Sequence, residues 1–366
     1  NEVKTTVTSK GRSGYNLPDQ LEGLGFVYKD SSLVYEMGLM IGTSTGPNVS
    51  DNVRGETAGN TDEDFAPVIP VYQINPPVKS HFDLTGQFND DPAGAMMLNA
   101  QVSHKSFAWN ETGHTKYVIL EYTITNMSGS TWTAFHAGIF ADWDIMDYNQ
   151  NYAATDAATK LGYAYSSQTG GIYAGIRLLT SGPFIHYAID NDGTGGGANI
   201  YDGYPSSEKY TTLSTNRSDA GMRDIASVVS SGPHTLNAGD SIVVAFALIA
   251  GDDLNDIITS GNNAQDKYDH LTYACYLPER DVQFGEVFPN PTDGNASIAF
   301  NLKERSLIEL DIMNISGQEM MSLGQYQLQT GSHQLPLPVA LLKPGIYFLK
   351  INQNGHRIIR KFIVSD

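Results

Sequence analysis

The sequence predicts a mainly β protein: a large antiparallel β-sandwich or jelly-roll-like domain with one helix, followed by a small Ig-like β-sandwich. The composition, with 36 Gly, 20 Tyr and only 17% charged residues, is typical of β-rich extracellular domains. Short runs that alternate apolar and polar residues are separated by Gly-, Asn- and Asp-containing turns along most of the chain. After residue 280 a new series of alternating runs begins, so we expect two domains, at residues 1–280 and 285–366.

The strands of the first domain are predicted from their alternation and from the turns between them. An entry strand at residues 2–10 precedes a hairpin at residues 24–42, and the polar, Gly-rich residues 43–64 are expected to form a long surface loop. Two long adjacent runs, residues 117–125 and 131–141, should form the centre of a sheet. Further strands are expected at residues 67–74, 81–88, 95–109, 160–167, 171–179, 184–190 and 240–251.

One helix is predicted in the first domain, at residues 252–274. Leu254, Ile257, Ile258, Tyr268 and Leu271 recur near helical spacing, and the Asp-rich start suits a helix N-terminus. We expect this helix to cover one end of the sandwich.

The second domain is predicted to contain five to seven short strands. They are expected near residues 296–302, 307–317, 333–339, 345–355 and 356–366. The Leu-Pro-Leu-Pro sequence within residues 335–338 favours an edge position, because proline cannot donate a hydrogen bond to a neighbouring strand.

The charge of the chain excludes two classes of partner. The formal net charge is −18, whereas nucleic acids and anionic membrane surfaces require basic patches. Residues 281–366 hold 8 acidic and 7 basic side chains, so almost all of the negative charge belongs to the first domain. No apolar run is long enough to span a membrane as a helix.

Four motifs follow one another near the end of the chain: VFPNPTDG, LDIMNISGQEM, LLKPGIYFLKI and RKFIVSD. In this order and spacing they resemble the type A C-terminal sorting domain of proteins exported by the type IX secretion system of Bacteroidota. The resemblance covers residues 285–366. The residues that match its sorting motifs are Pro289, Asn290, Pro291, Gly317, Gly345, Tyr347, Arg360, Lys361, Phe362, Ile363 and Val364.

The resemblance implies passage through the periplasm and the outer membrane of a Gram-negative Bacteroidota cell. The final location would be the cell surface or the extracellular medium. Its implied partners are the type IX translocon and its outer-membrane shuttle, and in many family members surface lipopolysaccharide.

A second set of motifs lies within residues 10–270: SGYN, LGFVY, LVYEMGLMIGTS, VSDNVRG and HAGIFADWDI. This set resembles the β-domain that follows the catalytic domain in some large subtilisin-like peptidases of Bacteroidota. The resemblance implies an accessory module of a peptidase. It assigns no catalytic residue to this chain, because the catalytic domain would precede Asn1.

Acidic clusters are candidate calcium sites. Asp142 and Asp144 follow a long predicted strand, residues 190–192 form an Asp-Asn-Asp turn before glycines, and residues 62–64 form a third group. Calcium binds six to eight oxygens from carboxylates, amides and carbonyls, although solvated turns have the same composition. The candidate metal ligands are Asp142, Asp144, Asp190, Asn191 and Asp192.

Three hypotheses for the first domain follow from these residues. The first is the peptidase-accessory module. The second is a stand-alone surface adhesin or carbohydrate-binding protein, in which the ligand-binding residues are Tyr201, Tyr204 and Tyr210 of a polar, Tyr-rich loop. The third hypothesis is a glycoside hydrolase, in which Asp142 and Asp144, two residues apart on one strand face, act as the acid and base pair.

Overall fold

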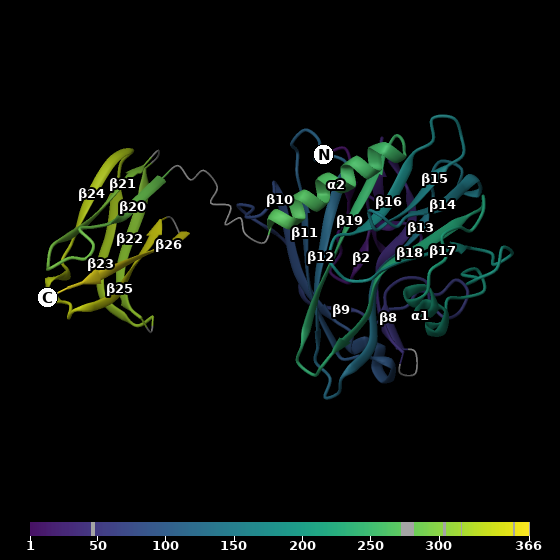
Figure 1. Cartoon of the computed structure of the whole chain (residues 1–366), viewed down its shortest axis with the longest axis horizontal. Helices are drawn as coiled ribbons and strands as arrows, with labels where there is room; N and C mark the ends of the chain where they lie inside the picture. The colour runs from purple at the N-terminus through teal and green to yellow at the C-terminus, as the bar shows by residue number, and fades with distance from the viewer. Residues whose placement is uncertain (45–47, 272–281, 303–304, 316, 354–355, 366) are drawn as a thin grey trace. The chain divides into compact units, whose positions relative to one another are not determined.

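The computed structural model describes residues 1–44, 48–271, 282–302, 305–315, 317–353 and 356–365. The chain divides into two compact units, Asn1–Tyr276 and Leu277–Asp366 (Figure 1). Each unit is built mainly from antiparallel strands, which confirms the predicted mainly β fold class.

The larger sheet of the N-terminal unit has eight antiparallel strands in the order β14-β15-β16-β19-β12-β11-β10-β9. The central strands β12 and β19 pair over most of their length, from Tyr117 opposite Ile249 to Thr125 opposite Ser241. The strands are β9 (Ala66–Ile74), β10 (Phe82–Asn89), β11 (Ala100–Ala108), β12 (Tyr117–Asn126), β14 (Asn151–Asp156), β15 (Leu161–Ser166), β16 (Tyr173–Leu178) and β19 (Ser241–Gly251).

The second sheet has the order β17-β18-β13-β7-β2, with β8 also paired to β7. Its strands are β2 (Arg12–Ser13), β7 (Val34–Thr43), β8 (Asn48–Asp51), β13 (Trp132–Trp143), β17 (Phe184–Asp190) and β18 (Ile225–Leu236). The predicted central strands at residues 117–125 and 131–141 are therefore neighbours in sequence but belong to different sheets.

The main core fills the space between the two sheets. Leu120 and Phe246 from the larger sheet pack with Leu39, Ile139 and Val229 from the second sheet, and all five are almost fully buried. This arrangement is a β-sandwich, in which alternate residues of each strand point inward.

The helix predicted at residues 252–274 is present, but it covers the outer face of the larger sheet and not one end of the sandwich; residues 272–274 lie outside the described residues. Helix α2 (Leu254–Leu271) packs Ile257 and Ala264 against Ile119 and Ile249. Because β19 is thus covered on both faces, its sequence is a continuous apolar run.

The outer face of the second sheet is covered by helix α1 (Ser206–Ser214), which the sequence did not predict. Leu213 of this helix packs with Met40, Phe140 and Val228 of the sheet. The segment was expected to be an exposed loop because it is rich in Ser, Thr and Tyr.

Residues 43–64, also expected to be a surface loop, contain β8 and several buried residues. Asp51, Asn52 and Val53 are almost fully buried, and the Asn52 side chain exchanges hydrogen bonds with the backbone of Phe65. Shorter elements complete the unit: β1 (Lys4–Thr5), β3 (Tyr15–Leu17), β4 (Leu21–Gly23), β5 (Phe26–Tyr28), β6 (Ser31–Ser32), η1 (Asp91–Met96) and η2 (Tyr148–Gln150).

The C-terminal unit contains two smaller sheets, β20-β21-β24 and β23-β22-β25-β26, around a core of its own. Strand β24 lies at an edge, the position that its Pro336 favours. The elements are β20 (Val282–Phe288), β21 (Ala296–Leu302), β22 (Ser306–Asn314), β23 (Glu319–Leu328), β24 (Gly331–Leu337), η3 (Val339–Leu341), β25 (Gly345–Gln353) and β26 (His356–Val364).

Within the described ranges, no helix combines the length and the apolar character that a membrane span requires.

Candidate functional site

A polar pocket of about 430 Å³ lies on the outer face of the second sheet of the N-terminal unit. Alternation along β13 places it there: Ala141 and Trp143 belong to the core between the sheets, so Asp142 between them points outward. The lining residues are Arg12, Pro18, Asp19, Tyr35, Glu36, Arg54, Gly59, Asn60, Thr61, Asp142, Asp144, Tyr148, Ile200, Tyr201 and Asp224.

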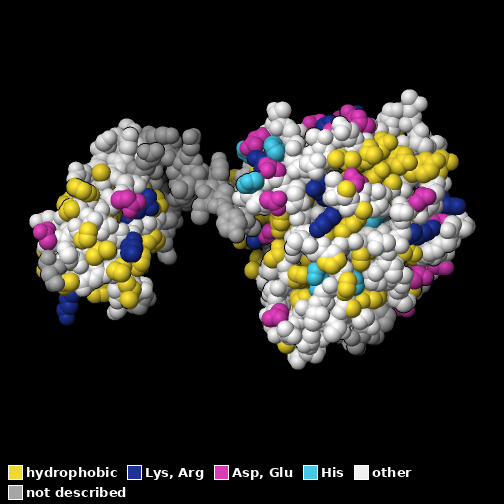
Figure 2. Space-filling view, in the orientation of Figure 1, with side chains coloured by type: hydrophobic (Ala, Val, Ile, Leu, Met, Phe, Trp, Pro, Cys, Tyr) yellow, Lys and Arg dark blue, Asp and Glu magenta, His cyan; other side chains and the backbone are white. Residues whose placement is uncertain are grey.

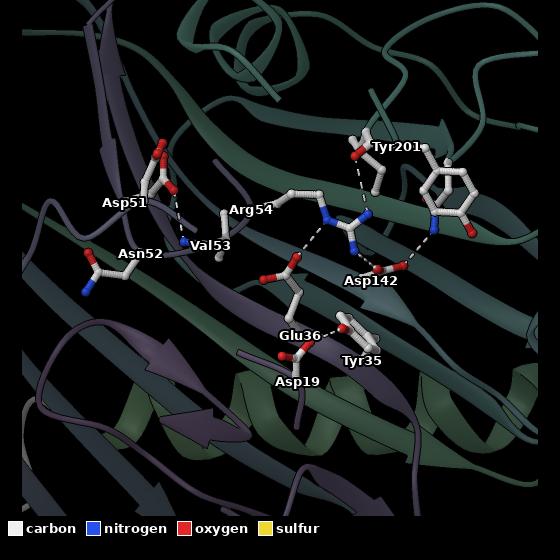
Figure 3. A network of polar contacts seen from close by, with 12 residues as sticks. Asp19, Tyr35, Glu36, Asp51, Asn52, Val53, Arg54, Asp142 and Tyr201 are labelled. Atoms are coloured by element: carbon white, nitrogen blue, oxygen red, sulfur yellow. Dashed lines mark hydrogen bonds and ion pairs between the residues drawn. The ribbon is translucent and has the colours of Figure 1, made fainter. Parts of the chain in front are cut away.

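Arg54 connects two carboxylates on the floor of the pocket (Figure 3). Its Nε lies 3.1 Å from Glu36 Oε1 and its Nη2 lies 2.7 Å from Asp142 Oδ2. Strand pairing sets this geometry, because Glu36 on β7 is directly opposite Asp142 on β13. The guanidinium also lies 5.8 Å from the centre of the Tyr35 ring, whose hydroxyl donates to Asp19.

The network continues from Asp142 to the other side of the pocket. Asn191 Nδ2 donates to Asp142 Oδ1 and to Asp224 Oδ1, each at 2.7 Å. The Tyr201 hydroxyl donates to Asp224 Oδ2. The side chains of the pocket are therefore fixed by one another before any ligand arrives.

Burial and mutual repulsion raise the pKa values of three of these carboxyl groups, those of Asp142, Asp144 and Asp224. Burial raises the pKa of Asp142 to about 8, while the neighbouring Arg54 opposes this shift. Burial together with the charge of Asp224 raises the pKa of Asp144 to about 6, and burial raises the pKa of Asp224 as well.

A second cluster holds the segment that carries Arg54. Lys209 Nζ, on α1, lies 2.8 and 2.7 Å from the two carboxylate oxygens of Asp51 and 2.7 Å from Asp62 Oδ2. Lys209 is completely buried, and so is Asp51. Asp51 Oδ1 also accepts from the backbone N–H of Val53, next to Arg54. This buried ion pair thus fixes α1 and residues 51–62 beside the pocket.

The structure brings together only part of the predicted metal set. Asp142, Asp144 and Asn191 lie in or beside the pocket, whereas Asp190 accepts from the backbone N–H of Gly195 and lies 3.3 Å from Arg223 Nε. Asp192 is exposed and caps the turn at Thr194.

In the described part of the chain, one group of three carboxylates is close enough to share an ion: Asp51, Asp62 and Asp64. Lys209 supplies a positive charge there through its contacts to Asp51 and Asp62. Calcium binding by the predicted residues stays a prediction.

Of the three predicted ligand-binding tyrosines, Tyr201 alone lines the pocket, and half of its surface is exposed. Tyr204 is completely buried, with its hydroxyl bonded to Thr212, so it belongs to the packing of α1 and is removed from any binding surface. Tyr210 is half-buried and donates to the carbonyl of Ala134.

Sequence reasoning missed Glu36, Arg54 and Asp224. A signal for Glu36 existed, because a carboxylate inside an otherwise apolar strand needs a buried partner. Arg54 and Asp224 carried no comparable signal, since neither lies within an apolar strand.

A separate row of tyrosines lies on the outer face of the larger sheet. Figure 2 shows hydrophobic side chains gathered over β14–β16. The ring of Tyr165 stacks on those of Tyr152 and Tyr173, with centroids 5.3 and 4.9 Å apart. These rings are partly buried against one another. We call Tyr152, Tyr165 and Tyr173 the second aromatic surface, to distinguish them from the tyrosines of the pocket.

The sorting motifs meet in the C-terminal unit although they are far apart in the sequence. Asn290 Oδ1 accepts from the backbone N–H of Ile363 at 2.9 Å. Arg360 donates through Nη2 to the carbonyl of Phe284 at 2.9 Å. Tyr347 and Phe362 are both buried and their rings stack with centroids 5.8 Å apart. Gly317 supplies the positive φ of the turn that follows Asn314.

Comparison with protein families identifies this unit. Residues 286–365 match the model of the secretion system C-terminal sorting domain, and this part of the chain belongs to that family. The predicted recognition of a type IX sorting domain is thereby confirmed. The domain indicates export by the type IX machinery to the cell surface or extracellular space of a Bacteroidota bacterium. No curated protein matches the sequence.

Two lyases and an epimerase of known structure are distantly similar to the chain. A polysaccharide lyase has 10% identity and a TM-score of 0.28, covering 100% of this chain and 46% of its own. A putative aldose 1-epimerase from Escherichia coli K12 has 9% identity and a TM-score of 0.35, covering 69% and 99%. A heparan sulfate lyase from Pedobacter heparinus has 9% identity and a TM-score of 0.28, covering 80% and 27%. The chain thus spans less than half of the two lyases, and we take no function from these low scores.

Proposed function

We propose that the protein is an exported carbohydrate-binding protein whose N-terminal unit holds a saccharide in the pocket formed by Glu36, Arg54, Asp142, Asp224 and Tyr201. The observation that carries the proposal is the combination, in one pocket of about 430 Å³, of aromatic rings and convergent hydrogen-bonding groups. A pocket of this size suits a small ligand or the end of a chain.

The chemistry of the lining fits a sugar. Tyr201 and Tyr148, 50% and 47% exposed, present rings on which the C–H face of a sugar can stack. Among the described residues, the hydrogen bond to the Asp144 side chain is a long one, 3.5 Å from Gln20 Nε2, so its oxygens can accept from sugar hydroxyls. Arg54 places a guanidinium group on the floor of the pocket, and its ion pairs with Glu36 and Asp142 fix the position of that group.

Export places such a pocket where polysaccharides occur. The sorting domain delivers the unit to the cell surface or beyond it. An adhesin or glycan-capturing protein has its ligands in that location.

A glycan array tests this proposal. The labelled full chain should bind a defined set of glycans, and Tyr201→Ala should lose that binding because the variant removes an exposed ring and the hydroxyl held by Asp224. Tyr165→Ala is the matched control, since it removes a tyrosine from the second aromatic surface. Equal binding by the wild type and Tyr201→Ala, or loss in Tyr165→Ala alone, would refute the assignment to the pocket.

Glycoside hydrolysis at Asp142 and Asp144 is the second candidate. It is favoured by the raised pKa values of these two residues, since a general acid must hold its proton near neutral pH. Hydrolysis would be supported if the wild type releases reducing ends from a glycan that binds on the array and the Asp144→Asn variant does not. Binding without any release of reducing ends would reject it.

The peptidase-accessory role is the alternative to both. Two of the motifs that suggest it, residues 33–44 and 136–145, contain β7 and much of β13, which are central strands of the sandwich. They also contribute Glu36, Asp142 and Asp144 to the pocket, so the likeness includes both the scaffold and part of the pocket lining. Copurification of a native subtilisin-like peptidase that loses activity without this chain would support that role, and an unchanged peptidase would reject it.

A further inference from the structure

We infer that the saccharide bound in this pocket carries a positively charged amino group, and that Asp144 and Asp224 are the residues that select it. This inference rests on the proposed carbohydrate-binding function and names the class of sugar: an amino sugar with a free amine.

The charges of the lining residues do not balance. Five carboxylates, Asp19, Glu36, Asp142, Asp144 and Asp224, face two guanidinium groups, those of Arg12 and Arg54. An anionic sugar, such as a uronic acid or a sulfated residue, would enter against this excess of negative groups.

The two arginines are already neutralised by their own partners. Arg54 pairs with Glu36 and Asp142 at 3.1 and 2.7 Å, and Arg12 Nη2 lies 3.7 Å from Glu36 Oε2. Arg12 is also held by the carbonyls of Asn52 and Tyr15. The excess carboxylates at the pocket are therefore Asp144 and Asp224, together with Asp19, which accepts from Tyr35.

Asp144 and Asp224 line the same pocket, and the negative charge of Asp224 opposes the ionisation of Asp144. The charge of Asp224 contributes to the raised pKa of both Asp142 and Asp144. An ammonium group placed between them would replace this repulsion with attraction. Asn191, completely buried, donates to both Asp142 and Asp224 and so holds these two carboxyl groups close to each other.

The aromatic rings complete the preference for an ammonium. Tyr201 is exposed beside Asp224, and Tyr148 lies at the same pocket as Asp144. Ring faces attract an amine and also stack on the sugar that carries it.

A metal ion fits this arrangement less well than an amine. A divalent cation needs several oxygens around one point. Among the described residues, the three carboxylates that lie this close together are those of Asp51, Asp62 and Asp64, which do not line the pocket. The separate carboxylates of the pocket instead suit an ammonium with hydroxyls around it.

Isothermal titration of the full chain with two tetrasaccharides tests the inference. One is the β-1,4-linked glucosamine tetramer, and the other is its fully N-acetylated form, which has the same backbone and no charge. We expect the amine form to bind at least about tenfold more tightly, because each tenfold step needs about 1.4 kcal/mol, a typical strength for a charge-assisted hydrogen bond.

Three variants complete the test. Asp144→Asn and Asp224→Asn should each reduce the preference for the amine form, while Asp30→Asn, an exposed turn residue that does not line the pocket, should leave it unchanged. Equal affinity for the two tetramers would overturn the inference and leave the carbohydrate function standing. A lysine tetrapeptide that binds as tightly as the glucosamine tetramer would overturn the saccharide assignment itself.

Discussion

Replacing Lys209 with Met should strongly destabilise the N-terminal unit. Lys209 Nζ is completely buried and makes contacts of 2.7 to 2.8 Å with Asp51 and Asp62. Methionine keeps the apolar stem but leaves the buried Asp51 without its cation. Removing one partner of a buried ion pair costs about 3–5 kcal/mol. For a domain of this size, about 2–4 °C are lost per kcal/mol, so the melting temperature should fall by roughly 6–20 °C.

Calorimetry of the full chain measures this change in the transition of the N-terminal unit. Lys105→Met is the matched control, because Lys105 is 47% exposed and its pair with Glu121 should contribute less than about 1 kcal/mol. Adding Asp51→Asn to Lys209→Met should recover part of the loss, since the unpaired buried charge is removed. Equal shifts for Lys209→Met and Lys105→Met, or no recovery in the double variant, would refute the reasoning.

Three further predictions concern separate parts of the chain. Burial raises the folded-state pKa of Asp64 to about 7, so the contribution of this group to stability is present at low pH and is lost as the pH rises through 7. In urea titrations between pH 4 and 8, the free energy of unfolding should therefore decline less with rising pH in Asp64→Asn than in the wild type. Gly203→Ala should destabilise the N-terminal unit by more than the roughly 1 kcal/mol expected for Gly170→Ala. Both glycines have positive φ, but only a Cβ at residue 203 would clash with a backbone atom, the oxygen of Glu56. Thermal melts of the two variants compare their stabilities. Phe362→Ala should cost about 3–5 kcal/mol in the sorting domain and reduce export to the cell surface, measured by protease accessibility, whereas Leu341→Ala, at an 82% exposed position, should be exported normally.

Much of the fold could be predicted because its signals are local. Alternation identified strands such as β12 and β13, and the helical spacing of apolar residues identified α2. Helix α1 was missed because its Ser- and Thr-rich sequence has low helix propensity, and tertiary packing of Leu213 and Lys209 stabilises it. The sorting domain was recognised because its motifs are contiguous.

The pocket could be predicted only in part. Asp142, Asp144 and Tyr201 stood out through neighbouring acidic or aromatic residues. Glu36 and Arg54 join them through the pairing of β7 with β13 and through the buried Lys209 cluster. Such contacts depend on strand register across a hundred residues, which the sequence does not reveal locally.

The most direct test of the proposed carbohydrate site is a crystal structure of the full chain with a glycan selected on the array. We expect the sugar to contact Tyr201 and Asp144 in the pocket on the outer face of the second sheet. A sugar bound instead on the tyrosines of β14–β16, with the pocket filled only by solvent, would contradict the account.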